Sequence, residues 1–248
     1  MTVVDFRHYW QNLNSRSVTE RVEWSACLTL ARLLSAALYL HEHDTEVPRL
    51  VPRRIVMTVL DTGECYPLLR PSSRISSGLD DLGTVADDVA ELINIMLQLD
   101  TSNCGGGGGV QRGTSDTSLK REKPVGAEIA AAISPKSSYS RCLQRVVRCL
   151  HEKNGNSWNE GLGQSLKLLE FTLWGPSEDE ARMIAVSDSR NTALQVWLSV
   201  TRCRLLAELA VVEGVAVSEN GLELAERAMF LCSATENSLL EVTKLLFT

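Results

Sequence analysis

Apolar residues recur every three or four positions along most of this chain, and this helical period is the feature that most constrains its fold. The first long example is residues 17–43, where Ser17 and Glu20 stand at the start with the spacing of a capping box. A shorter helix is expected before it, over residues 4–13. The apolar face of the long segment contains Cys27, Leu30, Leu34, Ala37 and Leu38.

The same period predicts a buried helix near 84–99 and, from residue 125 onward, helices nearly throughout. The expected later segments are 125–134, 137–152, 159–174, 178–187, 191–213 and 220–247. Residues 53–71 differ, because two short β-rich runs there flank the turn-forming triplet Asp61-Thr62-Gly63 and predict a hairpin. The predicted fold class is therefore mainly α with one small β-hairpin.

Composition limits the classes of function. The chain is 44% hydrophobic and 23% charged, which is enough to bury a core. Its net charge of −6 argues against a nucleic-acid partner, since such surfaces are usually basic. No apolar run is long enough to span a membrane. The seven cysteines show no pairing or zinc spacing, so we expect a reduced, cytoplasmic protein.

Residues 101–124 form a Gly/Ser/Thr/Lys tract with nothing to bury, and we expect a flexible insertion there. The five glycines at 105–109 do not predict a phosphate-binding loop. Such a loop needs a preceding strand, a following helix and usually a Lys-Ser/Thr pair at a fixed offset, and none is present.

No catalytic pattern in the sequence is convincing. Asp61-Thr62-Gly63 matches the aspartic-protease signature, but that chemistry needs two facing carboxylates and hence a second copy or a β-rich dimer. The same triplet is ordinary hairpin-turn sequence, which is the interpretation we favour. His41 and His43 are two positions apart and do not face each other on a helix. We expect no cofactor and no metal.

Three consecutive segments together resemble a known fold. The order ARLLSAALYLHEHD, VPRLVPRRIVM and DDVAELINIMLQL is similar to the C-terminal lobe of a protein kinase, where ALxYLHxxG precedes the catalytic loop HRDLKPENILL. The resemblance puts Arg49 where the catalytic Asp would be, Arg54 at the metal-binding Asn and Arg70 at the metal-binding Asp. It also makes Asp88 the residue that braces the catalytic loop. Such a site implies a kinase fold without catalysis.

The later helices narrow the resemblance. LLEFTLWGPSEDEAR (168–182), LQVWLSVTRCRLLAELA (194–210) and MFLCSATENSLLEVTKLLF (229–247) resemble the PEAK/Pragmin group of pseudokinases. The implied division is a first part of the C-lobe at 1–100, the insertion at 101–124, the rest of the lobe at 125–176 and a dimerising helical module at 177–248. The N-lobe, with its strand Lys, and the helix that precedes it in the group have no counterpart here.

In function, the resemblance implies an inactive scaffold that forms homo- or heterodimers with related pseudokinases. It also implies recruitment of protein partners in tyrosine-kinase and cytoskeletal signalling, which includes cell migration, and a cytoplasmic location at the cytoskeleton or adhesions. The alternative is an all-helical, repeat-like adaptor with no kinase relationship, which would not need the hairpin at 53–71 packed beneath the helix at 84–99.

The terminal helices carry wide apolar stripes that must be covered by something. Either they close the core of this chain, or part of them forms a two-fold interface. The candidate interface residues are Trp197, Leu198, Leu205, Leu209, Leu239, Val242 and Leu246.

Overall fold

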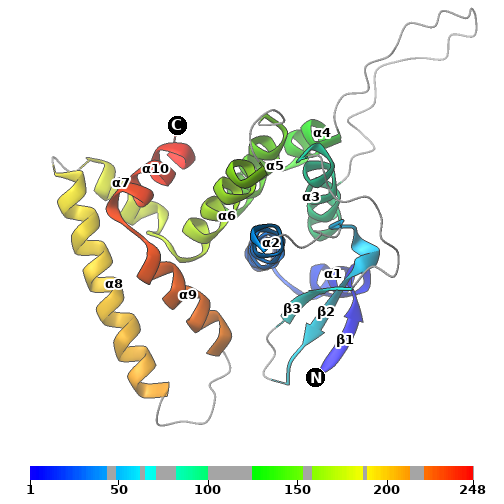
Figure 1. The fold of residues 1–248 in the computed structure, drawn as a ribbon, viewed down its shortest axis with the longest axis horizontal. Helices are drawn as coiled ribbons and strands as arrows, with labels where there is room; N and C mark the ends of the chain where they lie inside the picture. The colour runs from blue at the N-terminus through cyan, green and yellow to red at the C-terminus, as the bar shows by residue number, and fades with distance from the viewer. Residues whose placement is uncertain are drawn as a thin grey trace, which may run out of the picture.

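The computed structural model describes residues 1–43, 49–61, 65–70, 82–99, 125–152, 158–186, 189–212 and 221–247. The expected insertion at 101–124 and the Thr62-Gly63 part of the predicted turn lie outside these residues. The described residues form a helical lobe with a small sheet, followed by a second group of helices (Figure 1). The predicted fold class, mainly helical with a small β element, is confirmed.

The sheet has three antiparallel strands in the order β1-β2-β3: β1 (Thr2–Asp5), β2 (Ile55–Val59) and β3 (Cys65–Leu69). The predicted hairpin is β2-β3, with Val59 opposite Cys65 and Ile55 opposite Leu69. Strand β1 adds a third strand where the sequence predicts the start of a helix. The helix begins only at Phe6, because the Asp5 side chain accepts hydrogen bonds from the backbone N–H groups of Arg7 and His8.

The helices of the lobe lie close to their predicted positions. Helix α2 begins at Thr19 after Val18, without a side-chain cap, so the predicted Ser17–Glu20 capping box is wrong. A short 3-10 turn, η1, precedes β2. The bounds are α1 (Phe6–Arg16), α2 (Thr19–Glu42), η1 (Pro52–Arg54), α3 (Leu82–Leu97), α4 (Val125–Ala132), α5 (Ser138–Glu152) and α6 (Trp158–Trp174).

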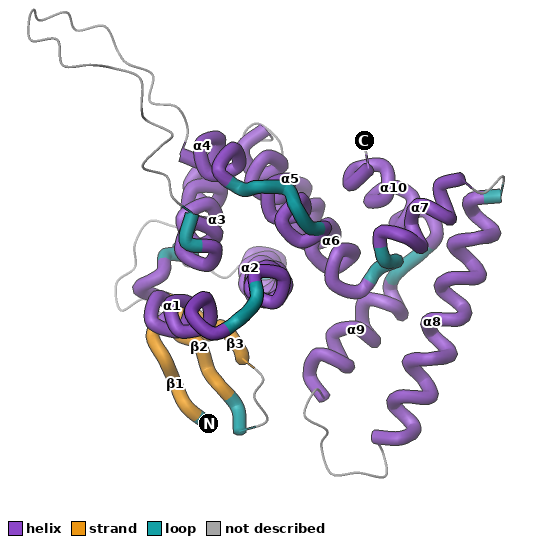
Figure 2. The backbone as a smooth tube through the Cα atoms, turned by 180° about the vertical axis from the view of Figure 1, so that it is seen from behind, coloured by secondary structure: helices purple, strands orange, loops and turns teal. Residues whose placement is uncertain are grey.

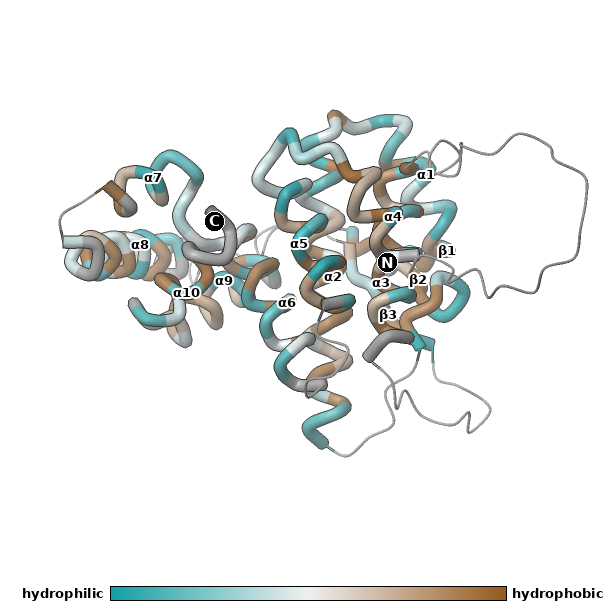
Figure 3. The backbone as a smooth tube through the Cα atoms, turned by 90° about the horizontal axis from the view of Figure 1, so that it is seen from above, coloured by the Kyte–Doolittle hydropathy of each residue, from teal (hydrophilic) through white to brown (hydrophobic). Residues whose placement is uncertain are grey.

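Helix α2 is the centre of the lobe. It contacts α3, α5, α6 and β3 (Figure 1). Figure 3 shows hydrophobic and hydrophilic stretches alternating along the helices, as amphipathic packing requires. The hairpin packs mainly on α1 and α2, whereas the sequence predicts α3 as its support. The largest fully buried side chains of this core include Phe6, Trp10, Leu30, Leu34, Ile55, Leu92 and Ile93.

A tight corner at Gly175 joins the lobe to the later helices. The Gly175 N–H donates to the Phe171 carbonyl at 2.8 Å and closes the end of α6. A Cβ atom at Gly175 would lie 2.3 Å from that carbonyl oxygen, so the corner needs glycine. Ser177 and Glu180 then cap α7 reciprocally, with Ser177 N–H donating to the Glu180 carboxylate at 2.8 Å.

The later helices form a separate layer beside α6, which we call the helical module (Figure 2). The sequence predicts one helix over 220–247, but the structure has two, because Arg202 donates hydrogen bonds to the carbonyls of Leu231 and Ala234 and ends the first. Thr235 and Ser238 cap the second. The bounds are α7 (Glu178–Val186), α8 (Arg190–Val212), α9 (Gly221–Ser233) and α10 (Glu236–Phe247).

Candidate functional site

The segment that precedes β2 is tied to α3 through Asp88. The buried Asp88 carboxylate accepts hydrogen bonds from Arg49 Nε at 2.9 Å and Arg49 Nη2 at 2.5 Å. It also accepts one from the Leu50 backbone N–H at 3.0 Å. These contacts fit the bracing role that the kinase resemblance gives Asp88, and that role stays a prediction.

The Arg49–Asp88 pair is asymmetric. The Asp88 side chain is 2% exposed and the Arg49 side chain 48% exposed. The hydrogen bonds to Asp88 raise the pKa of Arg49 further above its already high usual value, despite partial burial. Arg49 is therefore positively charged at neutral pH. A cation stands where the resemblance expects a carboxylate.

Arg54 and Arg70 lie side by side at one end of the hairpin. The Arg70 backbone N–H donates to the Arg54 carbonyl at 2.7 Å, next to the Ile55–Leu69 pair. The kinase resemblance gives these positions to two metal-binding side chains, which hold the same ions in an active enzyme. The β-ladder thus brings together the two positions that the resemblance pairs, and both carry arginine.

The other carboxylates of α3 near Arg49 either form an ion pair or face solvent. Glu91 pairs with Arg7 at 3.0 Å, and Asp87 is exposed. Within the part of the chain that the structure describes, no group of three or more His, Cys, Asp or Glu side chains is arranged to hold a metal ion. None of the described helices is both long and apolar enough to cross a membrane.

Comparison with known proteins finds similarity to inactive kinases. No family model matches the chain. The human inactive tyrosine-protein kinase PEAK1 is 34% identical over 116 residues, and the mouse protein of the same name is 31% identical over 116 residues. The crystal structure of the PEAK1 pseudokinase superposes with a TM-score of 0.67 at 20% identity, covering 97% of this chain and 64% of that chain. The chain is therefore similar to PEAK1, in sequence over part of its length and in fold over nearly all of it.

The extent of the match matters. The matches cover 45% of this chain and 6% of the human or mouse protein, so the chain spans a small part of its curated relatives. The structural match covers the lobe and the helical module together, which gives both a kinase-like PEAK fold. This fold argues against the alternative of a helical-repeat adaptor without a kinase relationship.

The helical module covers much of its own apolar surface. Four of the residues predicted at an interface are buried within the chain: Leu198, Leu205, Leu239 and Val242. Their part in an interface stays a prediction. Trp197 is half-buried. The side chains of Leu209 and Leu246 lie outside the described set.

A different apolar surface is open on α7 and α8. Met183 is 76% exposed and Val196 57% exposed, and with Val200 they surround Trp197 along a groove of about 620 Å³. We call this surface the α7–α8 face. The sequence contained a signal for it, since Trp197 and Val200 are three positions apart on one helix. Helix α8 is apolar on two sides, and the spacing alone did not show which side meets α9 and α10.

Proposed function

We propose that this chain is a non-catalytic, kinase-like scaffold that dimerises through its helical module and recruits signalling proteins. The observation that carries the proposal is the pairing of Arg49 with Asp88. It leaves a permanent cation at the position that the kinase resemblance gives to the catalytic aspartate.

The chemistry of phosphoryl transfer supports the lack of catalysis. Kinases neutralise the phosphates with Mg²⁺ ions held by side-chain oxygens and use an Asp to accept the substrate's proton. Arg49, Arg54 and Arg70 offer neither function, because a guanidinium repels a metal ion and cannot accept a proton. The similar proteins are named an inactive tyrosine-protein kinase and a pseudokinase, which supports the same conclusion.

The α7–α8 face supports dimerisation. Exposed apolar clusters of this kind are uncommon on monomers unless they bind something. A two-fold contact would let the same face meet its copy, with Trp197 and Val196 at its centre. A scaffold needs such a contact to bring two sets of recruited proteins together. We place its action in the cytoplasm, at the cytoskeleton or at adhesions, following the resemblance.

The first test is nucleotide binding. The melting temperature of the chain is measured with millimolar Mg-ATP, with Mg-ADP and with neither. We expect no shift, because ligands stabilise the native state only where they bind it. A reproducible shift with Mg-ATP that is absent with Mg-ADP would contradict the inactive assignment.

The second test is self-association. Light scattering across micromolar concentrations should show a dimer, and Val196→Glu should weaken it at least about tenfold, since a charge is buried without a partner. The control is Val18→Glu, the same change at an exposed valine before α2, which should leave the dimer unchanged. A mass that stays monomeric at all concentrations would contradict dimerisation by this chain.

A further inference from the structure

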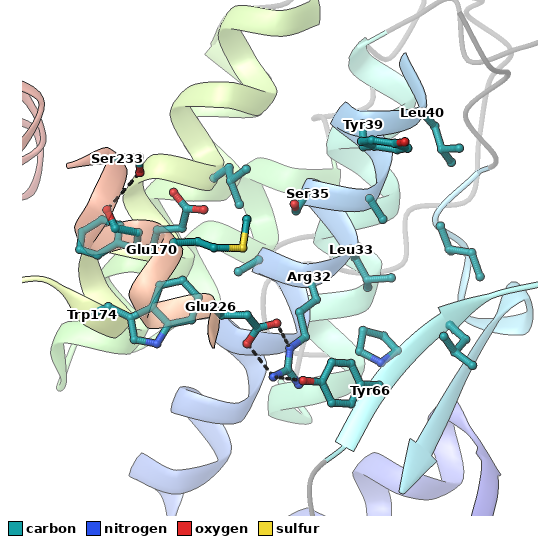
Figure 4. A pocket seen from close by; sticks show the side chains of 18 residues that line it. Arg32, Leu33, Ser35, Tyr39, Leu40, Tyr66, Glu170, Trp174, Glu226 and Ser233 are labelled. Carbon is teal, nitrogen blue, oxygen red and sulfur yellow. Dashed lines mark hydrogen bonds and ion pairs between the residues drawn. The ribbon is translucent and has the colours of Figure 1, made fainter. Parts of the chain in front are cut away.

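A second groove lies between the lobe and the helical module, away from the α7–α8 face. Four elements line it, α2, β3, α6 and α9, and its volume is about 740 Å³ (Figure 4). We call it the α2–α9 groove. The side chains that matter most are Ser35, Tyr39, Leu68, Glu170, Trp174 and Met229.

One end of this groove is fixed by an ion pair. Arg32 donates from Nε and Nη2 to the two carboxylate oxygens of Glu226, both at 2.7 Å (Figure 4). The guanidinium also lies 3.9 Å from the centre of the Tyr66 ring. These contacts hold α9 against α2 and β3. Because Arg32 and Glu226 neutralise each other, neither adds a net charge to the groove.

The walls of the groove are largely apolar and open. Tyr39 is 60% exposed and Met229 74% exposed, although both border the groove. Trp174 packs on Phe230 with 6.1 Å between ring centres, so the two rings join α6 and α9 along one wall of the groove. Ser35 is small, so a partner can come close to α2 between these side chains.

Glu170 places a carboxylate in this apolar setting. Its side chain extends from α6 into the groove (Figure 4). Among the described residues, none donates a hydrogen bond to it or pairs with it. Burial raises the pKa of Glu170 to about 6, and the nearby Lys167 opposes this only in part. At neutral pH the groove therefore contains a negative charge that the chain itself does not pair.

We propose that the α2–α9 groove binds an amphipathic helix of a partner protein, with apolar side chains between Tyr39 and Met229 and a Lys or Arg beside Glu170. Apolar walls favour the anchor positions of a helix bound in a groove. The unpaired carboxylate selects a basic residue among them, because burying it against an acidic or wholly apolar partner would be costly.

An added β-strand is a poorer occupant of this site. β3 is an edge strand, but Pro67 has no N–H to donate to a neighbouring strand. The Cys65 carbonyl already accepts a hydrogen bond from Arg32 Nη1 at 2.6 Å. A peptide strand would therefore lose pairing positions along a strand of only five residues. We therefore expect β3 to form one border of the groove and not to pair with a peptide strand.

The test is selection of peptides against the intact chain. A displayed library of 16-residue helical peptides is randomised at four apolar positions and one neighbouring polar position. We expect selected peptides to carry Lys or Arg at the polar position. Glu170→Gln should weaken their binding about tenfold, as loss of a charge-assisted contact does.

Two variants locate the binding. Ser35→Trp fills the groove from an exposed position on α2 and should abolish binding. Glu160→Gln removes an exposed carboxylate from the same helix as Glu170, outside the groove, and should change nothing. Circular dichroism checks that each variant is folded. The proposal is wrong if no peptide is enriched, if selected peptides show no basic preference, or if they bind Ser35→Trp as well as the wild type.

This inference is independent of dimerisation. Val196→Glu, which tests the α7–α8 face, should leave peptide binding intact. Ser35→Trp should likewise leave self-association intact. Loss of both activities in either variant would show that the two surfaces are not separate, which contradicts the proposal.

Discussion

Arg32 of α2 and Glu226 of α9 form a two-point ion pair that joins the kinase-like lobe to the helical module. Both side chains are largely buried, 10% and 25% exposed, and the guanidinium also bonds the Cys65 carbonyl and the Tyr66 hydroxyl. The residues are 194 positions apart in sequence, so the contact exists only when lobe and module are packed together.

This contact gives a direct test of how the two parts are held together. Glu226→Gln leaves the buried Arg32 without its charge partner and should lower the free energy of unfolding by about 2 kcal/mol. The control is Glu208→Gln, which breaks the more exposed Arg227–Glu208 pair of the same module and should cost about 0–1 kcal/mol. Urea denaturation measures both. Equal losses in the two variants would show that the Arg32–Glu226 pair stabilises the fold no more than the exposed pair does.

Placing at position 49 the carboxylate that the kinase resemblance expects should destabilise the fold. Arg49→Asp would place a second negative charge beside the buried Asp88, whereas Arg49→Asn has nearly the same shape without the charge. We expect the aspartate variant to be less stable than the asparagine variant by about 2 kcal/mol, with no gain of phosphoryl transfer. Equal stability of the two variants, measured by urea denaturation, would contradict this account of the site.

The stability contribution of Glu170 should depend on pH. The pKa in the folded chain, about 6, lies above the usual 4.5, so folding favours the protonated form. This contribution is complete below pH 4.5 and is lost as the pH rises through 6. Glu170→Gln should therefore be more stable than the wild type at pH 7.5, by about 1–2 kcal/mol, with little difference at pH 4.5. Urea denaturation at both values measures it, and a pH-independent difference would contradict the burial argument.

Gly126 and Gly163 should respond oppositely to alanine. A Cβ atom on Gly126 would lie 1.5 Å from His151 Nε2, so His151 must leave its partly buried position, at a cost of about 1–3 kcal/mol. Nothing lies within 4 Å of a Cβ atom on Gly163 in α6. Alanine there should raise the free energy of unfolding by up to about 1 kcal/mol, because it favours the helix more than glycine does. Thermal denaturation compares the two. Adding His151→Ala to Gly126→Ala should recover part of the loss, and no recovery would rule out this contact as its cause.

The amino-acid sequence determined the type and approximate position of most elements. A period of three to four residues needs no knowledge of partners, because it follows from the geometry of a single helix. The β2-β3 hairpin could be predicted for the same reason, since its strands are neighbours in the chain. The resemblance to pseudokinases likewise rested on local motifs, and the comparisons bear it out.

Only the tertiary structure decided how these elements meet. Strand β1 pairs with a strand more than fifty positions away, so Val3 and Val4 alone could not reveal it. The break between α9 and α10 depends on Arg202, which comes from another helix. Leu198 and Val196 are both apolar residues of α8, but Leu198 is buried and Val196 is 57% exposed. Which of two apolar faces becomes core depends on the position of its neighbours, and the Glu170 carboxylate lies in a groove only because three helices and a strand converge around it.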